Sequence, residues 1–320
     1  MDPIEILRVS NLPPFLVDDL HKAYLMHDNN HITDPDVLKR VVAIVGGGES
    51  KIDRKLLALL PNVKMISVFG VGYDGVDVAA AVEKGISVSH TPGVLNDDVA
   101  DLAMGLLLSV ARQIPRADQF VRAGDWVDGP FNLTKKLTGA RLGIVGLGRI
   151  GQAIAKRASA FDMKISYTAR SKKADLPFPY YPSAKALAAE VDFLLAITPG
   201  GDSTRGMINQ EVFEALGPKG FFINVARGSV VDQPAMIKAL ENKVIAGAGL
   251  DVYYDEPRIS PELRHLPNVV LTPHMASGTF ETRRAMADLA LANLAAYFSG
   301  TPIPALVPEC QAPQLEQKII

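Results

Sequence analysis

Short apolar runs rich in β-branched residues alternate with segments of helical periodicity along almost the whole chain. Examples of the apolar runs are VVAIVG at 41–46, FLLAI at 193–197 and FFINVA at 221–226. Strands of this kind, separated by helices, are typical of βαβ units, in which successive strands run parallel. The alternation therefore predicts an α/β protein built on doubly wound parallel sheets.

Two long helical patterns interrupt this alternation. Residues 1–95 form a first block, and a helical pattern follows from Asn96 or Asp97, either of which can cap it, to Gly124. A second block of strands and helices precedes another helical pattern at 279–300, which could carry the chain back to the first block. The 320 residues exceed the size at which one core usually keeps growing. We therefore predict two Rossmann-like domains linked by two long helices.

The charges of the chain nearly cancel, with 33 Lys and Arg against 35 Asp and Glu. This balance provides no global field for nucleic acid or an anionic membrane, so neither is an expected partner. The apolar runs are too short to span a bilayer, and the first ten residues lack the pattern of a signal peptide. With a single cysteine, Cys310, the chain cannot form an internal disulfide, and we expect a cytoplasmic protein. No cluster of metal-ligand residues is visible, so no metal is predicted.

Gly146, Gly148 and Gly151 form a G-x-G-x-x-G pattern between the apolar run LGIV and a helical pattern that starts at once. In this context the first glycine permits a tight turn, the second lets the backbone approach a pyrophosphate, and the third lets helix and strand pack closely. The helix N-terminus then offers unpaired N–H groups to the anion. We interpret the segment as a dinucleotide-binding turn; the alternative is a glycine-rich turn without a ligand.

A basic loop stands where such folds usually have an acidic residue about twenty positions after the turn. The loop contains Arg170, Ser171, Lys172 and Lys173. An acidic residue would accept hydrogen bonds from the ribose of NAD, whereas an arginine can hold the 2′-phosphate of NADP. The loop therefore predicts that NADP(H) is preferred and NAD(H) is secondary. A solvated basic loop without a ligand is the alternative.

Three titratable residues follow later strands of the second block, at the sheet edge where ligands of open α/β sheets bind. They are Arg227, Glu256 and His274. A forked guanidinium suits a substrate carboxylate, an imidazole suits proton delivery near neutral pH, and a carboxylate beside it favours the charged imidazole. Each residue taken singly has a structural explanation. His90 also adjoins a Thr–Pro step, but no suitable acid or arginine accompanies it, so we expect a structural role for it.

The segments GLGRIG, INVARGSVVD, GLDVYYDEP and LTPHMASGT resemble, in order and spacing, the D-isomer-specific 2-hydroxyacid dehydrogenases. The earlier segments FGVGYDGVD and TPGVLNDDVADLAMGLLLSVAR also match, and the resemblance is strongest to the NADPH-dependent glyoxylate/hydroxypyruvate reductases and the hydroxyphenylpyruvate reductases. The resemblance implies that Arg227 binds the substrate carboxylate, that His274 is the acid/base and that Glu256 supports His274. It further implies that Val71 and Gly72 offer backbone N–H groups to the same carboxylate.

The same resemblance implies a substrate-binding domain of residues 1–97 plus 285–320, a dinucleotide-binding domain of residues 98–284 and a homodimer. One departure is MASGT at 275–279, where many relatives have IGSAT. The cofactor-binding residues expected from the motifs and the resemblance are Gly146, Gly148, Arg149, Ile150, Gly151, Arg170, Ser171, Lys172, Thr198, Val225, Ala226, Arg227, Asp251, His274 and Gly278.

The expected activity is NADPH-dependent reduction of small 2-oxo acids, such as glyoxylate and hydroxypyruvate, to glycolate or D-2-hydroxy acids. One alternative is an aromatic 2-oxo acid reductase acting on phenylpyruvate or hydroxyphenylpyruvate. Another, of a different class, is a non-catalytic NAD(P)-sensing interaction protein. Formate dehydrogenases of the wider family pair their histidine with glutamine, so Glu256 argues against that activity.

Overall fold

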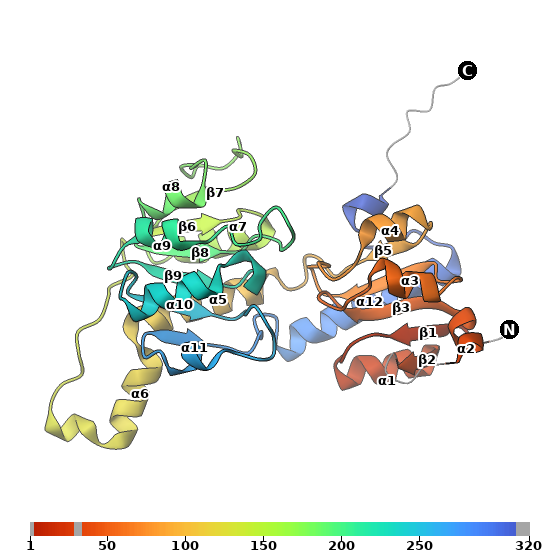
Figure 1. The fold of residues 1–320 in the computed structure, drawn as a ribbon, viewed down its shortest axis with the longest axis horizontal. Helices are drawn as coiled ribbons and strands as arrows, with labels where there is room; N and C mark the ends of the chain where they lie inside the picture. The colour runs from red at the N-terminus through yellow and green to blue at the C-terminus, as the bar shows by residue number, and fades with distance from the viewer. Residues whose placement is uncertain (1–2, 29–33, 312–320) are drawn as a thin grey trace. The chain divides into compact units, whose positions relative to one another are not determined.

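The computed structural model describes residues 3–28 and 34–311 and divides into two compact units. Unit 1 comprises Met1–Leu95 and Thr279–Ile320, and unit 2 comprises Asn96–Gly278 (Figure 1). The boundaries expected from the sequence, 97/98 and 284/285, fall inside helices α5 (Asn96–Arg112) and α12 (Phe280–Ser299). Which unit binds substrate and which binds cofactor stays a prediction.

Unit 1 contains a five-stranded sheet of order β2-β1-β3-β4-β5, in which every neighbouring pair is parallel. In Figure 1 the blue helix α12 lies beside this sheet, and the Ser67 hydroxyl on β4 donates to the Ala290 carbonyl of α12. The strands are β1 (Glu5–Arg8), β2 (Leu25–Asp28), β3 (Val41–Gly47), β4 (Met65–Phe69) and β5 (Ser87–Ser89); the other helices are α1 (Pro14–Ala23), α2 (Pro35–Arg40), α3 (Arg54–Leu59), α4 (Val78–Glu83) and the 3-10 helix η4 (Pro308–Cys310).

Unit 2 contains a six-stranded parallel sheet of order β11-β10-β9-β8-β6-β7. The first strand of this sheet is β6. The next strand, β7, pairs on one side of β6, and β8 to β11 follow on its other side, so the strand order reverses between β6 and β8. The strands are β6 (Arg141–Val145), β7 (Lys164–Thr168), β8 (Phe193–Ala196), β9 (Phe221–Asn224), β10 (Gly247–Leu250) and β11 (Val269–Leu271). The remaining helices are α6 (Ile114–Ala123), η2 (Asp125–Asp128), α7 (Arg149–Ser159), α8 (Ala184–Ala188), α9 (Gln210–Leu216), η3 (Gly228–Val230), α10 (Gln233–Glu241) and α11 (Pro261–His265).

The prediction of one long helix from Asn96 to Gly124 is wrong, because α5 ends at Arg112 and α6 begins at Ile114. Gln113 between them has a left-handed backbone with φ of 51°. Pro115 explains the break, since a proline has no N–H to donate and is tolerated in the first turn of a new helix. The α/β class and the two parallel sheets are confirmed.

Helix α5 packs on the sheet of unit 2 through closely spaced backbones. A side chain at Gly249 on β10 would approach the Leu106 Cβ of α5 to 3.1 Å, so glycine permits this contact. Arg157 of α7 forms ion pairs with Asp97 and Asp101 of α5. Among the described residues, no helix is both long and apolar enough to cross a membrane.

Candidate active site

Six loops of unit 2 follow the carboxyl ends of its strands. Because the strands are parallel, these loops lie along one edge of the sheet. The sequence-predicted residues are distributed over this edge, with Gly146 after β6, Arg170 after β7, Thr198 after β8, Arg227 after β9, Asp251 after β10 and His274 after β11. The topology therefore brings Gly146 and His274, which are 128 positions apart in sequence, to one edge of the sheet.

The glycine turn has the backbone that a phosphate cradle requires. Gly146 has φ of 101°, which favours glycine, and a Cβ there would lie 2.8 Å from the Ile197 carbonyl oxygen. A Cβ at Gly151 would collide with the Gly146 carbonyl oxygen. Gly148, in contrast, faces open space and precedes α7 without a side-chain cap. The uncapped N-terminus of α7 thus fits a dinucleotide pyrophosphate, with Arg149 and Ile150 in its first turn.

The basic loop after β7 is anchored at its far end. The buried Tyr167 hydroxyl accepts a hydrogen bond of 2.7 Å from the Lys173 N–H. Arg170, Ser171 and Lys172 are exposed, and within the described ranges neither Arg170 nor Lys172 has an ion-pair partner. Since β7 lies next to β6, the loop is beside the glycine turn at the same edge. Its cations are available to an anion.

The turn that carries Arg227 is shaped by Asn224, a buried residue at the end of β9. The Asn224 side chain accepts a hydrogen bond of 3.0 Å from the Ala226 N–H and donates one of 3.2 Å to the Arg227 carbonyl. A Cβ at Gly228 would collide with the Tyr253 carbonyl oxygen, so the turn contacts the segment that leads to Glu256. Sequence reasoning missed Asn224; a polar residue closing the apolar run FFI was the available signal.

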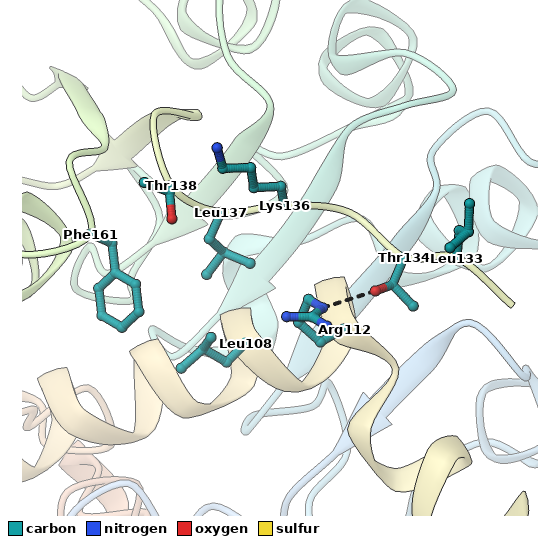
Figure 2. Close-up of a pocket in the computed structure, with 8 residues that line it drawn as sticks. All are labelled: Leu108, Arg112, Leu133, Thr134, Lys136, Leu137, Thr138 and Phe161. Carbon is teal, nitrogen blue, oxygen red and sulfur yellow. Dashed lines mark hydrogen bonds between the residues drawn. The ribbon is translucent and has the colours of Figure 1, made fainter. Parts of the chain in front are cut away.

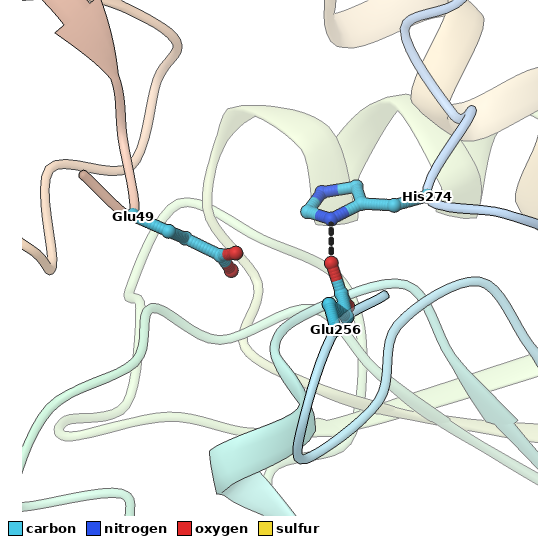
Figure 3. A group of neighbouring side chains, drawn as sticks. All are labelled: Glu49, Glu256 and His274. Carbon is cyan, nitrogen blue, oxygen red and sulfur yellow. Dashed lines mark hydrogen bonds and ion pairs between the residues drawn. The ribbon is translucent and has the colours of Figure 1, made fainter. Parts of the chain in front are cut away.

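His274 and Glu256 form the hydrogen-bonded pair drawn in Figure 3. The distance from His274 Nδ1 to Glu256 Oε2 is 2.6 Å, and the other carboxylate oxygen of Glu256 accepts the Tyr253 N–H at 2.8 Å. The carboxylate is mostly buried, with 18% of the side chain exposed, against 39% for His274. Because the carboxylate accepts, Nδ1 carries a proton, and proton transfer to a substrate would use the other imidazole nitrogen, Nε2.

Asp251 holds the loop in which His274 adopts its unusual backbone. His274 has φ of 48°, in the left-handed region. The fully buried Asp251 carboxylate accepts from the Thr272 hydroxyl at 2.6 Å, the Met275 N–H at 2.9 Å and the Ala276 N–H at 3.0 Å. Burial raises the pKa of Asp251 and these hydrogen bonds oppose the rise. The carboxylate therefore positions the His274 loop; a contact with the cofactor stays a prediction.

Tyr253 and Thr272 complete the support of this loop, and sequence reasoning missed both. The Tyr253 hydroxyl donates to the Thr272 carbonyl at 2.8 Å, and burial raises the pKa of Tyr253, so the phenol keeps its proton. Gly278 closes the loop through a hydrogen bond of 2.7 Å from its N–H to the Met275 carbonyl. Of the other expected cofactor residues, Val225 and Ala226 are buried and Thr198 is partly exposed.

Val71 and Gly72 belong to unit 1, in the loop after β4. Their joint role with Arg227 stays a prediction. A groove of about 390 Å³ in unit 2 lies elsewhere, between α5 and the segment 133–138 (Figure 2). Its lining includes Arg112, whose Nε donates to the Thr134 hydroxyl at 2.8 Å, and none of the residues predicted to bind cofactor or substrate.

Residues 104–276 match the NAD binding domain of the D-isomer specific 2-hydroxyacid dehydrogenases. A hydroxyphenylpyruvate reductase from Plectranthus scutellarioides is 45% identical over 95% of this chain and 98% of its own. A glyoxylate/hydroxypyruvate reductase A from Arabidopsis thaliana is 43% identical over 94% and 97%. An NADPH-dependent glyoxylate/hydroxypyruvate reductase from Sinorhizobium meliloti, solved with NADP and malonate, superposes with a TM-score of 0.91 at 41% identity and covers 97% and 98% of the two chains. These likenesses confirm the fold and the resemblance found in the sequence.

Proposed function

Because the chain belongs to the D-isomer specific 2-hydroxyacid dehydrogenase family, we propose that it reduces small 2-oxo acids, glyoxylate and hydroxypyruvate among them, with NADPH. The products are glycolate or D-2-hydroxy acids. The observation that carries the proposal is the His274–Glu256 pair at the sheet edge where the glycine turn and Arg227 also lie. An acid, a carboxylate-binding cation and an anion-binding helix terminus are the groups that this reduction needs.

Each residue then has a distinct task. The Arg227 guanidinium binds the substrate carboxylate, aided by the backbone N–H groups of Val71 and Gly72. Bound NADPH supplies the hydride that adds to C2. His274 donates the Nε2 proton to the carbonyl oxygen, on which negative charge develops, while Nδ1 stays hydrogen-bonded to Glu256. One hydride and one proton convert the ketone or aldehyde to an alcohol.

The basic loop supports NADP(H) as the preferred cofactor. Arg170 and Lys172 are exposed cations beside the glycine turn, and Ser171 adds a hydroxyl donor. An NADP 2′-phosphate gains charge-assisted hydrogen bonds there, whereas the hydroxyl of NAD gains little. The relative from Sinorhizobium meliloti is described as NADPH-dependent and carries NADP, which also supports the proposal.

Steady-state kinetics test the activity and the cofactor together. The wild-type chain is assayed for NADPH and NADH oxidation with glyoxylate, hydroxypyruvate, phenylpyruvate and 4-hydroxyphenylpyruvate. We expect turnover of the two small acids with a higher kcat/KM for NADPH. Equal efficiency with NADH would contradict the cofactor proposal, and no turnover of any acid would favour a non-catalytic sensing protein.

A second candidate is reduction of aromatic 2-oxo acids. It is favoured by the 45% identity to the hydroxyphenylpyruvate reductase. The same panel decides between the two, since a kcat/KM for 4-hydroxyphenylpyruvate above that for both small acids would replace the main proposal.

We also propose that the chain forms a homodimer through α6, η2 and the segment 129–133. This part of unit 2 presents large apolar side chains to solvent, with Trp126, Val127 and Leu133 exposed by 66%, 90% and 100%. Helix α6 extends away from the sheet of its own unit (Figure 1). Large apolar side chains that gather on a protein surface are typical of an interface, and three such side chains lie here within eight residues of sequence. A cytoplasmic location stays a prediction, which cell fractionation tests.

A further inference from the structure

We propose that His90 is a positioning residue, whose imidazole fixes the Val71–Gly72 peptide so that its N–H is aimed at the substrate carboxylate. The inference rests on the proposed function and assigns a role to a histidine that the sequence indicated to be structural. His90 follows β5, and Val71 follows β4, the neighbouring strand of unit 1. The parallel pairing brings the two loops to the same edge.

The geometry of one hydrogen bond carries the inference. His90 Nδ1 lies 2.9 Å from the Val71 carbonyl oxygen. Because a carbonyl oxygen can only accept, Nδ1 carries the proton and donates. The Val71 carbonyl and the Gly72 N–H belong to one planar trans peptide and point in opposite directions. Holding the oxygen on one side therefore sets the direction of the N–H on the other.

In the rest of the loop, the carbonyls of Gly70 and Gly72 contact other parts of unit 1. The Thr91 N–H donates to the Gly70 carbonyl at 2.8 Å. The Gly72 carbonyl packs against Gly48 so closely that a Cβ at Gly48 would collide with it. Within residues 3–28 and 34–311, the N–H groups of Val71 and Gly72 have no hydrogen-bond acceptor. Both residues are partly exposed, and successive unpaired backbone N–H groups of a turn are donors that an anion can use.

His90 is itself held from several directions. The backbone N–H of His90 donates to the Ala305 carbonyl at 3.0 Å, and the side-chain amide of the fully buried Asn293 donates to the His90 carbonyl at 3.1 Å. The Tyr73 ring packs edge-on against the imidazole, with ring centroids 5.4 Å apart. The Tyr73 hydroxyl in turn donates to the Glu309 carboxylate at 3.2 Å. A side chain restrained in this way can impose an orientation on the peptide that it contacts.

The chemistry of the bond specifies which substitutions preserve it. The Asn Nδ2 is separated from Cβ by one planar carbon, as His Nδ1 is, so His90→Asn can donate from nearly the same position. His90→Leu fills similar space and cannot donate. His21→Leu is the matched control, because it makes the same chemical change at an exposed position on α1 of the same unit.

The test measures steady-state reduction of glyoxylate by NADPH and crystal structures of both His90 variants. For His90→Leu we expect the KM for glyoxylate to rise about tenfold or more, because a hydrogen bond to a charged carboxylate loses its alignment. The KM for NADPH should stay within about twofold, a split that general loss of structure would not produce. His90→Asn should restore the KM for glyoxylate to within about threefold of wild type, and His21→Leu should change neither constant.

The outcomes separate this inference from the proposed function. If the wild type reduces glyoxylate and folded His90→Leu keeps its KM, the inference is overturned. If His90→Leu does not fold, His90→Asn decides alone, since a folded Asn variant with a tenfold higher KM also overturns it. If the wild type reduces no 2-oxo acid, the proposed function fails and the crystal structures test the positioning role alone. A Val71–Gly72 peptide that turns in His90→Leu and keeps its direction in His90→Asn supports the role. A peptide that is unchanged in both variants refutes it.

Discussion

At the scale of single residues, the site depends on side chains whose partners fix their chemistry. Glu256 holds the Nδ1–H of His274, and Asp251 holds the loop that places His274 in a left-handed backbone. The sequence identified Glu256 and His274 by their positions after apolar runs, and Asp251 through the family resemblance. It could not reveal that Asp251 accepts three hydrogen bonds from residues 21 to 25 positions away, because such contacts arise only when β10 and β11 pair.

Arg170 provides a prediction at this scale. Replacing Arg170 with Ala removes a forked cation from the basic loop, so the KM for NADPH should rise about tenfold while the KM for NADH changes less than twofold. Lys238→Ala, which removes an exposed cation from α10, is the control and should change neither constant. The measurement is cofactor kinetics at saturating glyoxylate. A parallel rise in both constants would show that Arg170 does not contact the 2′-phosphate.

At the scale of elements, the glycine turn joins β6 to α7, and its glycines differ in how much space a side chain would have. The sequence pattern alone assigned distinct tasks to Gly148 and Gly151, and the structure agrees with the local part of that assignment. Gly151 packs against the Gly146 carbonyl, whereas Gly148 faces open space. In contrast, the break between α5 and α6 was missed, although Pro115 was visible, because apolar periodicity continues across Gln113.

The two glycines give a paired prediction. Gly148→Ala should leave the melting temperature within about 1 °C, because its Cβ meets nothing and its φ of −78° suits alanine, while the Kd for NADPH rises about tenfold. Gly151→Ala should lower the stability by roughly 1–3 kcal/mol through overpacking. Thermal unfolding and fluorescence titration with NADPH measure both effects. A Gly148→Ala variant with an unchanged Kd would show that the backbone there does not approach the cofactor.

At the scale of the whole molecule, the chain builds unit 1 from both of its ends and inserts unit 2 between them. The long helical pattern at 279–300 indicated that the chain could return to the first block, because periodicity over many residues is a strong signal, and the family resemblance implied the insertion. The roles and the bounds of the two expected domains stay a prediction. The sequence could not predict that Trp126, Val127 and Leu133 are exposed, because apolar residues of the same kind also form buried faces. Whether such a side chain is buried depends on which other parts of the chain cover it.

The proposed homodimer is tested at this scale. Val127→Asp together with Leu133→Asp places two charges on the exposed apolar surface and should convert a dimer to a monomer, because unpaired charges are costly to bury. Light scattering during gel filtration measures the mass, and circular dichroism checks the fold. The control is Val82→Asp on α4 of unit 1, which is exposed by 46% and lies outside the proposed interface. A wild-type mass of one chain would contradict the dimer.

The central claim is that His274 is the proton donor for reduction of a 2-oxo acid, and the rate of NADPH oxidation with glyoxylate tests it most directly. We predict that His274→Ala lowers kcat by about 10²- to 10⁴-fold, the usual effect of losing a general acid. His265→Ala, an exposed histidine on α11 of the same unit, should keep kcat within about twofold. A folded His274→Ala enzyme with wild-type turnover would contradict the account.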